Sequence, residues 1–255
     1  DSISGLNVSS LPDGTLTISL TLTDEYGNVS SAVTDTIVKD ANAPAVSEIA
    51  IASGNYKAGD SISFSLMFSE ELVLSGANSD YNLAIDIGGI SRQAVLTSNA
   101  AGVLTFSYTV QTGENSDDGG VSIASDGLSV LNGATIKDAG NNEATLTFSG
   151  INNTDAKVDT TAPLLAVVSS PAEAVFVNAA DYPISGTHSE VGVTIKLYAD
   201  TDNNGVADGT VLLTTVVGAQ NDWSLLQPLT ADTTQIKSAF GSSASQALRN
   251  MILCL

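Results

Sequence analysis

Apolar and polar residues alternate one by one along most of this chain. In residues 15–23 the odd positions are all Thr or Ser, whereas the even positions are all apolar. The same alternation recurs in residues 61–68, 81–87 and 104–110. A period of two predicts β-strands that turn one face to a core and the other to water. The residues expected to point inward are Leu16, Ile18, Leu20 and Leu22, then Ile62, Phe64, Leu66 and Phe68, then Tyr81, Leu83, Ile85 and Ile87, and then Leu104, Phe106, Tyr108 and Val110.

Gly, Asn and Asp residues separate these segments, and no amphipathic helical pattern stands out before residue 235. Short strands at regular spacing, with turn residues between them, are typical of β-sandwiches. We therefore expect an all-β protein.

Two parts of the chain repeat each other. TLTDEYGN at residues 21–28 leads to KDANAP at residues 39–44, and ATIKDAGN at residues 134–141 leads to VDTTAP at residues 158–163. Asp24 corresponds to Asp138 and Pro44 to Pro163, so the period is about 115 residues, the size of one all-β domain. Each repeat ends in an Asp/Gly/Asn loop, a last strand, and an Asp-bearing linker closed by proline. This order indicates a chain of domains.

The prolines mark the expected domain boundaries. Residues 1–40 have the pattern of the last strands of a domain, residues 44–160 that of a complete sandwich, and residues 163–234 that of a sandwich without its last strands. Residues 235–255 lose both the alternation and the turn signals. We expect this non-repeat tail to result from a truncation or a frameshift near residue 234. The alternative is a short C-terminal helix over residues 235–253.

The charge balance excludes several classes of partner. The 255 residues contain 28 Asp and Glu against 8 Lys and Arg, for a net charge of -20. This charge repels nucleic acid and anionic lipid, so we expect neither as a partner. It suits surroundings in which divalent cations neutralise carboxylates, and an ordinary acidic surface would have the same composition. The longest apolar stretch, residues 162–168, is too short to insert across a membrane.

Residues suited to catalysis are scarce. His188 is the only histidine, which excludes His-rich metal sites and makes a Ser-His-Asp triad depend on one residue. We expect His188 in a loop near the start of the third domain. Many serines fall on outward strand positions, and no Gly-rich phosphate loop follows a strand. The single cysteine, Cys254, allows no intrachain disulfide. We expect no enzyme activity.

Six segments together resemble the tandem bacterial immunoglobulin-like domains of large RTX-type surface adhesins. They are YKAGDSISFSLMFSE (residues 56–70), LAIDIGG (83–89), LTFSYTVQTGENSDDGGVSI (104–123), IKDAGNNEATLTF (136–148), VDTTAP (158–163) and SGTHSEVGVTIKLYADTDNNGVADG (185–209). The resemblance covers residues 1–234. It implies immunoglobulin-like β-sandwiches arranged end to end, in an extracellular stalk on a bacterial cell surface, with Ca²⁺ at the domain junctions and often in surface loops.

The same resemblance implies the partners and the route of export. Neighbouring repeats of the same chain are the direct partners, and other domains of the protein would contact a host or biofilm surface. Such proteins are typically exported by type I secretion.

The sharpest local motif is DTDNNGVAD at residues 200–208. Oxygen donors at the first, third and fifth positions, glycine at the sixth, a carbonyl at the seventh and a carboxylate at the ninth match the first part of an EF-hand calcium loop. Val211 stands where that loop has its last glutamate. We expect Ca²⁺ here, with a polar hairpin turn as the alternative. The expected ligands are Asp200, Asp202, Asn204, the carbonyl of Val206, and Asp208.

A second kind of site is expected where one domain leads into the next. In a sandwich, the loop after the second strand and the loop before the last strand lie at the end where the domain begins. In the second domain these loops carry Glu70 and Asp138, and the leading linker (residues 40–42) carries Asp40 and Asn42. Carboxylates converging between acidic domains would repel one another without a cation. We expect Ca²⁺ bound by Asp40, Glu70 and Asp138, with Asn42 as a weaker candidate.

The third domain repeats part of this arrangement. Asp159 lies in the trailing linker (residues 159–161), and Glu190 follows a strand as Glu70 does. We expect both to contribute to a second junction site for Ca²⁺. For each of these junction residues the alternative is a solvated turn carboxylate.

Two further features, one loop and one tyrosine, are expected to have a structural role only. Residues 113–119 are interpreted as a polar turn, the alternative being that they approach the junction with the third domain. Tyr26 is expected to pack within its own loop.

The function expected from these observations is a structural extender segment stiffened by Ca²⁺. The alternative is a module that itself binds carbohydrate, or one that accompanies an extracellular enzyme. Sugar binding would need an exposed aromatic platform, but most aromatic residues alternate inward, and Trp223 is expected to fill the third core.

Overall fold

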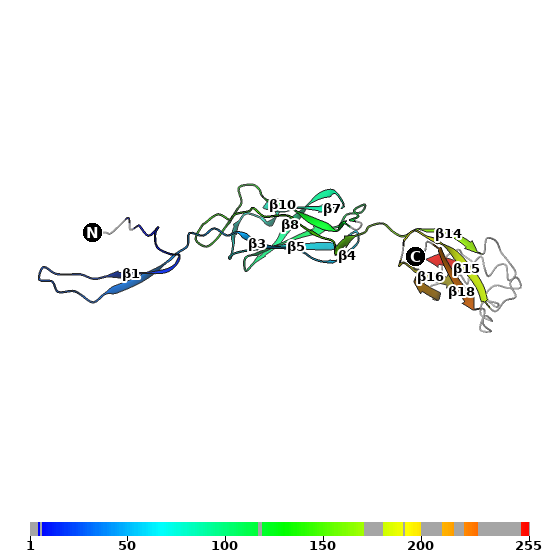
Figure 1. Ribbon diagram of the computed structural model, residues 1–255, viewed down its shortest axis with the longest axis horizontal. Coiled ribbons are helices and arrows are strands. Elements are labelled where there is room, and N and C mark those ends of the chain that lie inside the picture. Colours follow the sequence, from blue (N-terminus) through cyan, green and yellow to red (C-terminus); the bar gives the residue numbers. More distant parts are fainter. Residues whose placement is uncertain are drawn as a thin grey trace. The chain divides into compact units, whose positions relative to one another are not determined.

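The computed structural model describes residues 5, 7–116, 119–170, 181–190, 192–199, 211–216, 222–228 and 251–254. The chain forms two compact units, Asp1–Thr161 and Ala162–Leu255 (Figure 1). The described residues are almost all strands and loops, with a short 3-10 turn at η1 (Asn78–Asp80), and none of their helical structure is long and apolar enough to cross a membrane. The all-β prediction is confirmed. The finer division at residues 1–40, 44–160, 163–234 and 235–255 stays a prediction.

A two-stranded antiparallel hairpin opens the first unit. β1 (Gly14–Leu20) pairs with β2 (Val33–Lys39), as the alternation predicts. The predicted burial of this segment is wrong, because a two-stranded ribbon has no second layer of its own to cover an apolar face. Leu16 is half-buried, whereas Ile18, Leu20 and Leu22 are 38%, 54% and 79% exposed.

The remaining strands of the first unit follow the alternation closely. The predicted segments 61–68, 81–87 and 104–110 all become strands. In chain order the elements are β3 (Val46–Ile51), β4 (Gly54–Tyr56), β5 (Ser61–Phe68), β6 (Val73–Ser75), β7 (Tyr81–Ile87), β8 (Ile90–Ala100), β9 (Val103–Thr109), β10 (Val121–Val130), β11 (Thr135–Lys137), β12 (Ile151–Asn153) and β13 (Ala156–Val158).

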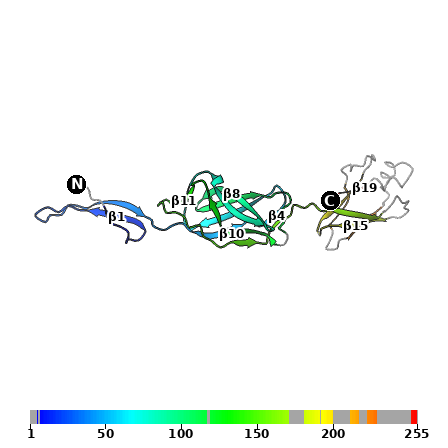
Figure 2. The ribbon, with the colours of Figure 1, turned by 90° about the horizontal axis from the view of Figure 1, so that it is seen from above.

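Seven of these strands form one antiparallel sheet in the order β12-β10-β7-β8-β9-β5-β3. Lettered A to G along the chain, they have the strand order of an immunoglobulin constant-type sandwich, ABED followed by CFG, with D paired to C through the β7–β8 hairpin. The sheet folds into two layers (Figure 2). Its two edges come together where the Asn153 side-chain amide of β12 donates a hydrogen bond of 2.9 Å to the Ile51 carbonyl of β3.

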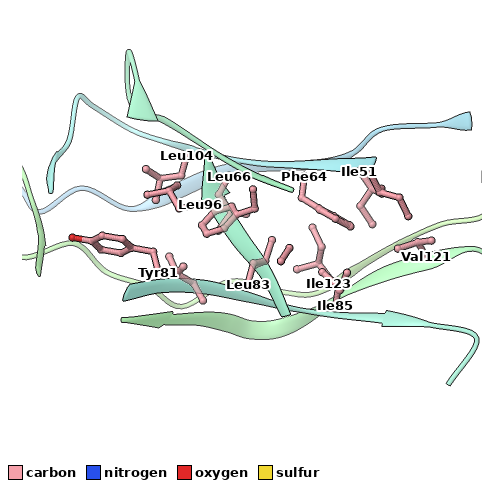
Figure 3. Packing of buried hydrophobic residues seen from close by; sticks show 14 of the residues in the cluster. Ile51, Phe64, Leu66, Tyr81, Leu83, Ile85, Leu96, Leu104, Val121 and Ile123 are labelled. Atoms are coloured by element: carbon pink, nitrogen blue, oxygen red, sulfur yellow. The ribbon is translucent and has the colours of Figure 1, made fainter. Parts of the chain in front are cut away.

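The core lies between these two layers. Figure 3 shows Tyr81, Leu83 and Ile85 of one layer pointing toward Phe64 and Leu66 of the other. All five side chains are 0–1% exposed. The predicted inward faces of residues 61–68 and 81–87 are confirmed. Burial of these large side chains is the main source of stability for the sandwich.

Two small sheets close the ends of the sandwich. β6 pairs with β11, and the Tyr81 hydroxyl donates to the carbonyls of Ser75 and Thr135, one on each of these strands. β13 pairs in parallel with β4 and leads directly into the trailing linker. Strand pairing therefore holds the chain in place up to the residue before Asp159.

The second unit contains two three-stranded sheets. Their orders are β14-β15-β18 and β17-β16-β19. The strands are β14 (Leu165–Ser170), β15 (Asp181–His188), β16 (Thr194–Ala199), β17 (Val211–Val216), β18 (Asp222–Pro228) and β19 (Met251–Cys254).

Two expectations for the second unit change. His188 is not a loop residue: it ends β15 and is 3% exposed. β19 lies in the non-repeat tail and pairs antiparallel with β16, so residues 251–253 are strand, which contradicts the helical alternative at that end. Residues 235–250 lie outside the described residues, and the truncation hypothesis stays a prediction.

Candidate metal centre at the leading linker

The loop after β11 holds Asp138 in a fixed orientation. The Asn142 backbone amide donates to Asp138 Oδ1 and the Asn142 side-chain amide donates to Oδ2, each at 2.8 Å. The Asp138 amide in turn donates to the Asn142 carbonyl at 3.1 Å. Asp138 is 4% exposed. Aspartate and asparagine with this spacing suit a tight loop because their short side chains can bond the local backbone.

The loop at residues 24–28 has the same hydrogen bonds. Asn28 donates to Asp24 Oδ1 from its backbone at 2.8 Å and to Oδ2 from its side chain at 2.8 Å, and the Asp24 amide donates to the Asn28 carbonyl at 3.0 Å. The sequence repeat is therefore also a repeat of local structure. This loop provides an internal control for Asp138, because the three-carboxylate cluster described below includes Asp138 and not Asp24.

Glu70 follows the end of β5 and is placed by its neighbour Ser69. The Ser69 amide donates to the Ala45 carbonyl at 2.9 Å, and the Ala45 amide donates to Ser69 Oγ at 3.1 Å. This reciprocal pair fastens the end of β5 to the start of β3. Gly102, at φ +76°, lies directly against the Glu70 carbonyl, where a Cβ atom would overlap it. The backbone on both sides of Glu70 is therefore fixed.

Asp40 lies in the leading linker and turns back onto that linker. Its Oδ1 accepts a hydrogen bond of 3.1 Å from the Asn42 amide, and its carbonyl accepts one of 3.3 Å from the Asn142 side chain. The Asp138 loop can approach so closely because residue 140 is glycine: a Cβ there would lie 3.1 Å from the Asp40 Cβ. Farther along, the Thr145 amide donates to the Pro44 carbonyl at 2.7 Å.

Together these three segments bring three carboxylates to one place. Asp40, Glu70 and Asp138 each offer an oxygen atom within 4.8 Å of the other two. Asp40 and Glu70 are half-buried, and Asp138 is buried. The residues come from the linker, from the loop after the second strand and from the loop before the last strand, as the sandwich topology predicts for this end.

The electrostatics of the cluster are uneven. Burial raises the pKa of Glu70, and the neighbouring charges of Asp40 and Asp138 raise it further. Burial also opposes ionisation of Asp138, but the hydrogen bonds from Asn142 and from the loop amides outweigh it and hold the pKa of Asp138 below its usual value. Asp138 is therefore the fixed anion of the group, and Glu70 is the carboxyl whose ionisation is penalised.

The lysines that adjoin the cluster in sequence bind other carboxylates. Lys39 Nζ lies 2.6 Å from Asp13, and Lys137 Nζ lies 3.7 Å from Glu143. Neither of these pairs includes a member of the cluster. Chemically, the site offers hard, anionic oxygen ligands, which suit Ca²⁺ or Mg²⁺ and do not suit a softer transition metal.

The other predicted ligands lie elsewhere. Asn42 is exposed, and its amide bonds Asp40. Asp159 is exposed in the first unit, where its Oδ1 accepts a hydrogen bond of 2.9 Å from the Thr161 amide, the same local turn that Asp40 makes. Glu190 is half-buried in the second unit. The calcium-loop residues Asp200, Asp202, Asn204, Val206 and Asp208 lie outside the described residues.

Glu190 stands in the same local arrangement as Glu70. The Leu164 amide donates to Ser189 Oγ at 2.8 Å, and the Ser189 amide donates to the Leu164 carbonyl at 3.2 Å. This repeats the reciprocal pair of Ser69 and Ala45. His188 occupies the position that Phe68 has in the first unit, one residue before the serine, and both are buried.

For residues 113–116 the interpretation of segment 113–119 as a polar turn is wrong, and residues 117 and 118 lie outside the described residues. Glu114 and Ser116 are 1% and 3% exposed. Glu114 binds Arg92 and Tyr108, and both partners stand at inward positions of alternating strands. A charged or polar tip at an inward strand position was the signal in the sequence, because a half-buried Arg at such a position favours an acidic partner.

Exposed aromatic residues give little support to sugar binding. Tyr26 is 83% exposed, which contradicts its expected packing within its loop. In the sandwich, Phe64, Phe106 and Tyr81 are buried, and Tyr56 and Tyr108 are half-buried with bonded hydroxyls. Among the side chains that the structure describes, one strongly exposed ring does not form a stacking platform. The Trp223 side chain lies outside what the structure describes.

Comparison with known proteins adds only distant likenesses. No protein-family model matches the sequence, and no curated protein matches it. Among solved structures, the FN1-FN3 domains of chicken CNTN1 align at 13% identity and a TM-score of 0.30, over 84% of this chain and 65% of that one. A DUF4785 family protein from Legionella pneumophila aligns at 11% identity and a TM-score of 0.29, over 91% of this chain and 56% of that one.

The Escherichia coli adhesin FdeC aligns at 12% identity and a TM-score of 0.30, over 89% of this chain and 83% of that one. The chain spans less than two thirds of the length of the CNTN1 and DUF4785 structures. At these scores the alignments carry no argument about function, which has to come from the residues themselves.

Proposed function

We propose that this chain is a structural extender segment from the stalk of a bacterial cell-surface adhesin, and that Ca²⁺ at its domain junctions makes it rigid. The observation that carries the proposal is the convergence of Asp40, Glu70 and Asp138 from three separate segments. Of these, one is a linker and two belong to loops of the sandwich. A cation bound there would tie the linker to the domain that follows it.

The spacing of the cluster supports Ca²⁺. Ligand oxygens within 4.8 Å of one another fit around one ion, because two oxygens on opposite sides of Ca²⁺ are separated by twice a bond of about 2.4 Å. Three carboxylates provide three to six of the roughly six to eight oxygens that Ca²⁺ takes, and water can supply the rest. Mg²⁺ demands a stricter octahedron and releases its water reluctantly, so a cluster assembled from three separate segments favours Ca²⁺.

Charge gives the physical reason for stiffening. Without a cation, repulsion among the three carboxylates favours separation of the linker from the loops. Burial is the main cause of the raised pKa of Glu70, and the charges of Asp40 and Asp138 add to it. With a cation bound, each carboxylate is attracted to the ion, this attraction outweighs the repulsion, and the linker loses its hinge freedom. The junction then keeps one orientation, and the segment keeps its length and transmits force.

A tandem arrangement of domains is supported by the internal repeats. The Asp24 and Asp138 loops, the Asp40 and Asp159 turns, and the Ser69 and Ser189 pairs each repeat one local structure. In this proposal Asp159 and Glu190 form part of a second junction site, and residues 200–208 form a loop site. The direct partners are neighbouring repeats, and other domains contact a host or biofilm surface.

The hairpin β1–β2 fits the same proposal. Its sequence corresponds to the last strands of the sandwich, and it exposes the apolar face that those strands bury. An additional immunoglobulin-like layer would cover that face. Extracellular location, an RTX-type adhesin and type I secretion belong to this proposal through the sequence resemblance and have no further support.

Calorimetric titration of Ca²⁺ into the chelated protein tests the metal centre. We expect saturable binding that exceeds a Mg²⁺ control, and a higher melting temperature in Ca²⁺, because a ligand that binds only the native state stabilises it. Glu70→Gln and Asp138→Asn should weaken this binding. Asp24→Asn alters the matching loop outside the cluster and should not. Equal binding by Glu70→Gln and the unaltered protein would contradict the assignment.

Small-angle scattering tests the mechanical part separately. We expect the maximum dimension to be well defined in Ca²⁺ and the distribution of dimensions to broaden after chelation. If Ca²⁺ binds to the cluster but the scattering does not change, the site is real and the stiffening role is wrong.

A further inference from the structure

A buried carboxylate lies at the end of the sandwich where the chain leaves it. Glu114 is 1% exposed and is therefore withdrawn from water. A buried charge is tolerated only when it is paired and hydrogen-bonded. Glu114 meets that condition through three different partners.

The bonds to Glu114 use both of its oxygens. Oε1 accepts from Arg92 Nε and from the Tyr108 hydroxyl, the latter at 2.6 Å, and Oε2 accepts from the Gln111 backbone amide at 2.8 Å. Arg92 belongs to β8 and Tyr108 to β9. The carboxylate thus fastens the loop at residues 111–116 to two neighbouring strands of the main sheet.

A glycine in the turn between β7 and β8 supports the same loop. Gly88 lies in the β7–β8 turn at φ +59°, and a Cβ atom there would overlap the Asn115 carbonyl. Only a glycine allows this close approach. The loop is therefore held by side-chain bonds on one side and by backbone contact on the other.

The loop in turn holds the chain on either side of Asp159. Ser116 and Val158 exchange two hydrogen bonds, Ser116 N to Val158 O at 2.9 Å and Val158 N to Ser116 Oγ at 2.8 Å. The Thr160 amide donates to Asn115 Oδ1 at 2.8 Å, and the Gly113 amide donates to Thr160 Oγ1 at 2.9 Å. The Asn115 side-chain amide donates to Thr161 Oγ1 at 3.1 Å.

We propose that Glu114 anchors a latch, residues 113–116, that fixes the trailing linker to the sandwich without a metal ion. The latch uses protein hydrogen bonds alone, in contrast to the carboxylate cluster at the leading linker. Residues 159–161, and the Asp159 carboxylate among them, then move as part of the sandwich. This inference is independent of Ca²⁺ and goes beyond the proposed function.

The latch differs from an ordinary surface turn in what it requires. A solvated turn would tolerate loss of one side chain, because water would replace each lost bond. In the latch, the Glu114 carboxylate is 1% exposed, so water does not replace its bonds to the Tyr108 hydroxyl and the Gln111 amide, although the Arg92 side chain is itself 36% exposed. The effect should then spread to residues that do not touch Glu114, namely Val158 and Thr160.

Amide hydrogen exchange on the full chain, read by NMR, tests the proposal. In the unaltered protein the Val158 and Thr160 amides should be protected equally in Ca²⁺ and in chelator. Glu114→Gln should speed exchange at both amides by about tenfold or more, with little change at core amides such as Phe64. Glu143→Gln removes the exposed partner of Lys137 and serves as the matched control, with no effect at Val158 or Thr160.

A second variant keeps the test decisive if Glu114→Gln does not fold. Asn115→Ala leaves Glu114 and its partners intact and removes the acceptor of the Thr160 amide. It should release Thr160 and leave Val158 protected. The proposal is overturned if Thr160 exchanges freely in the unaltered protein, if chelation removes its protection, or if either variant, when folded, leaves Thr160 protected.

Discussion

Gly140 lies against Asp40, so that a Cβ atom added at residue 140 would stand 3.1 Å from the Asp40 Cβ. The same atom would lie 3.0 Å from Asn142 Nδ2 and 3.2 Å from Asp138 Oδ1. The equivalent position in the first repeat is Tyr26. The absence of a side chain at residue 140 is thus a condition for the close approach of the leading linker to the Asp138 loop.

Gly140→Ala should weaken Ca²⁺ binding while leaving the fold intact. The added methyl group would lie closer to its neighbours than an ordinary van der Waals contact allows. The linker therefore has to move away by a few tenths of an ångström, and the three carboxylates separate. We expect at least about a threefold loss of affinity by calorimetry. Gly119→Ala is the control, because a Cβ there meets nothing within 4 Å. Unchanged affinity in Gly140→Ala would show that the linker position does not matter to the cation.

Glu70→Gln should stabilise the chelated protein and weaken its response to Ca²⁺. The folded pKa of Glu70 is raised, so its contribution to stability is present below the unfolded pKa and is lost as pH rises through the folded pKa. At neutral pH the ionised carboxylate is therefore a cost that the neutral amide avoids. We expect a melting temperature higher by about 1–3 °C in chelator. The gain on adding Ca²⁺ should be smaller than in the unaltered protein.

Acid should destabilise the first unit through Glu114. Burial opposes the ionisation of Glu114, but the bonds from Tyr108, the Gln111 amide and Arg92 outweigh it and lower its pKa. A depressed folded pKa contributes stability that is fully present above the unfolded pKa of about 4.3 and is lost as pH falls through the folded pKa.

Urea unfolding at a series of pH values measures this dependence. The unaltered protein should lose stability between about pH 5 and pH 2, and Glu114→Gln should be less stable at pH 7 with a flatter profile in acid. Parallel profiles for the two proteins would mean that Glu114 does not contribute to acid sensitivity.

Phe64→Ala should destabilise the sandwich more than any surface change. Phe64 stands opposite Phe106 in the β5–β9 ladder, and both are 0% exposed. Removing the ring loses apolar burial and leaves a cavity, at a cost of about 3–5 kcal/mol. Val73→Ala, at a side chain that is 56% exposed, should change the free energy of unfolding by less than about 0.5 kcal/mol. Urea unfolding followed by intrinsic fluorescence and circular dichroism measures both.

Much of the fold was predictable because the sequence pattern that indicates a strand lies within the strand itself. A strand with one face in a core has to alternate apolar and polar residues, so residues 61–68 and 81–87 carry their own evidence. The convergence of Asp40, Glu70 and Asp138 could also be predicted, since the order of strands in a sandwich decides which loops lie at the same end. No single spacing in the sequence joins residues so far apart in the chain.

Burial of an apolar face was not predictable from alternation alone. Leu20 has the same pattern as Leu66, yet it is 54% exposed whereas Leu66 is 0% exposed. The pattern states that a face is apolar, and it does not state whether a second layer lies over it. For the hairpin β1–β2 the described structure provides no such layer.

By itself, the sequence determined the all-β class, the positions of the strands and the repeated Asp-containing loops, because these depend on neighbours within a few residues. Only the tertiary structure decided that Glu114 is buried and bonded to Arg92 and Tyr108, and that its loop holds Thr160. Those contacts join two strands, a loop and a linker. Their energy depends on exclusion of water, which arises only when the sheet has folded into two layers.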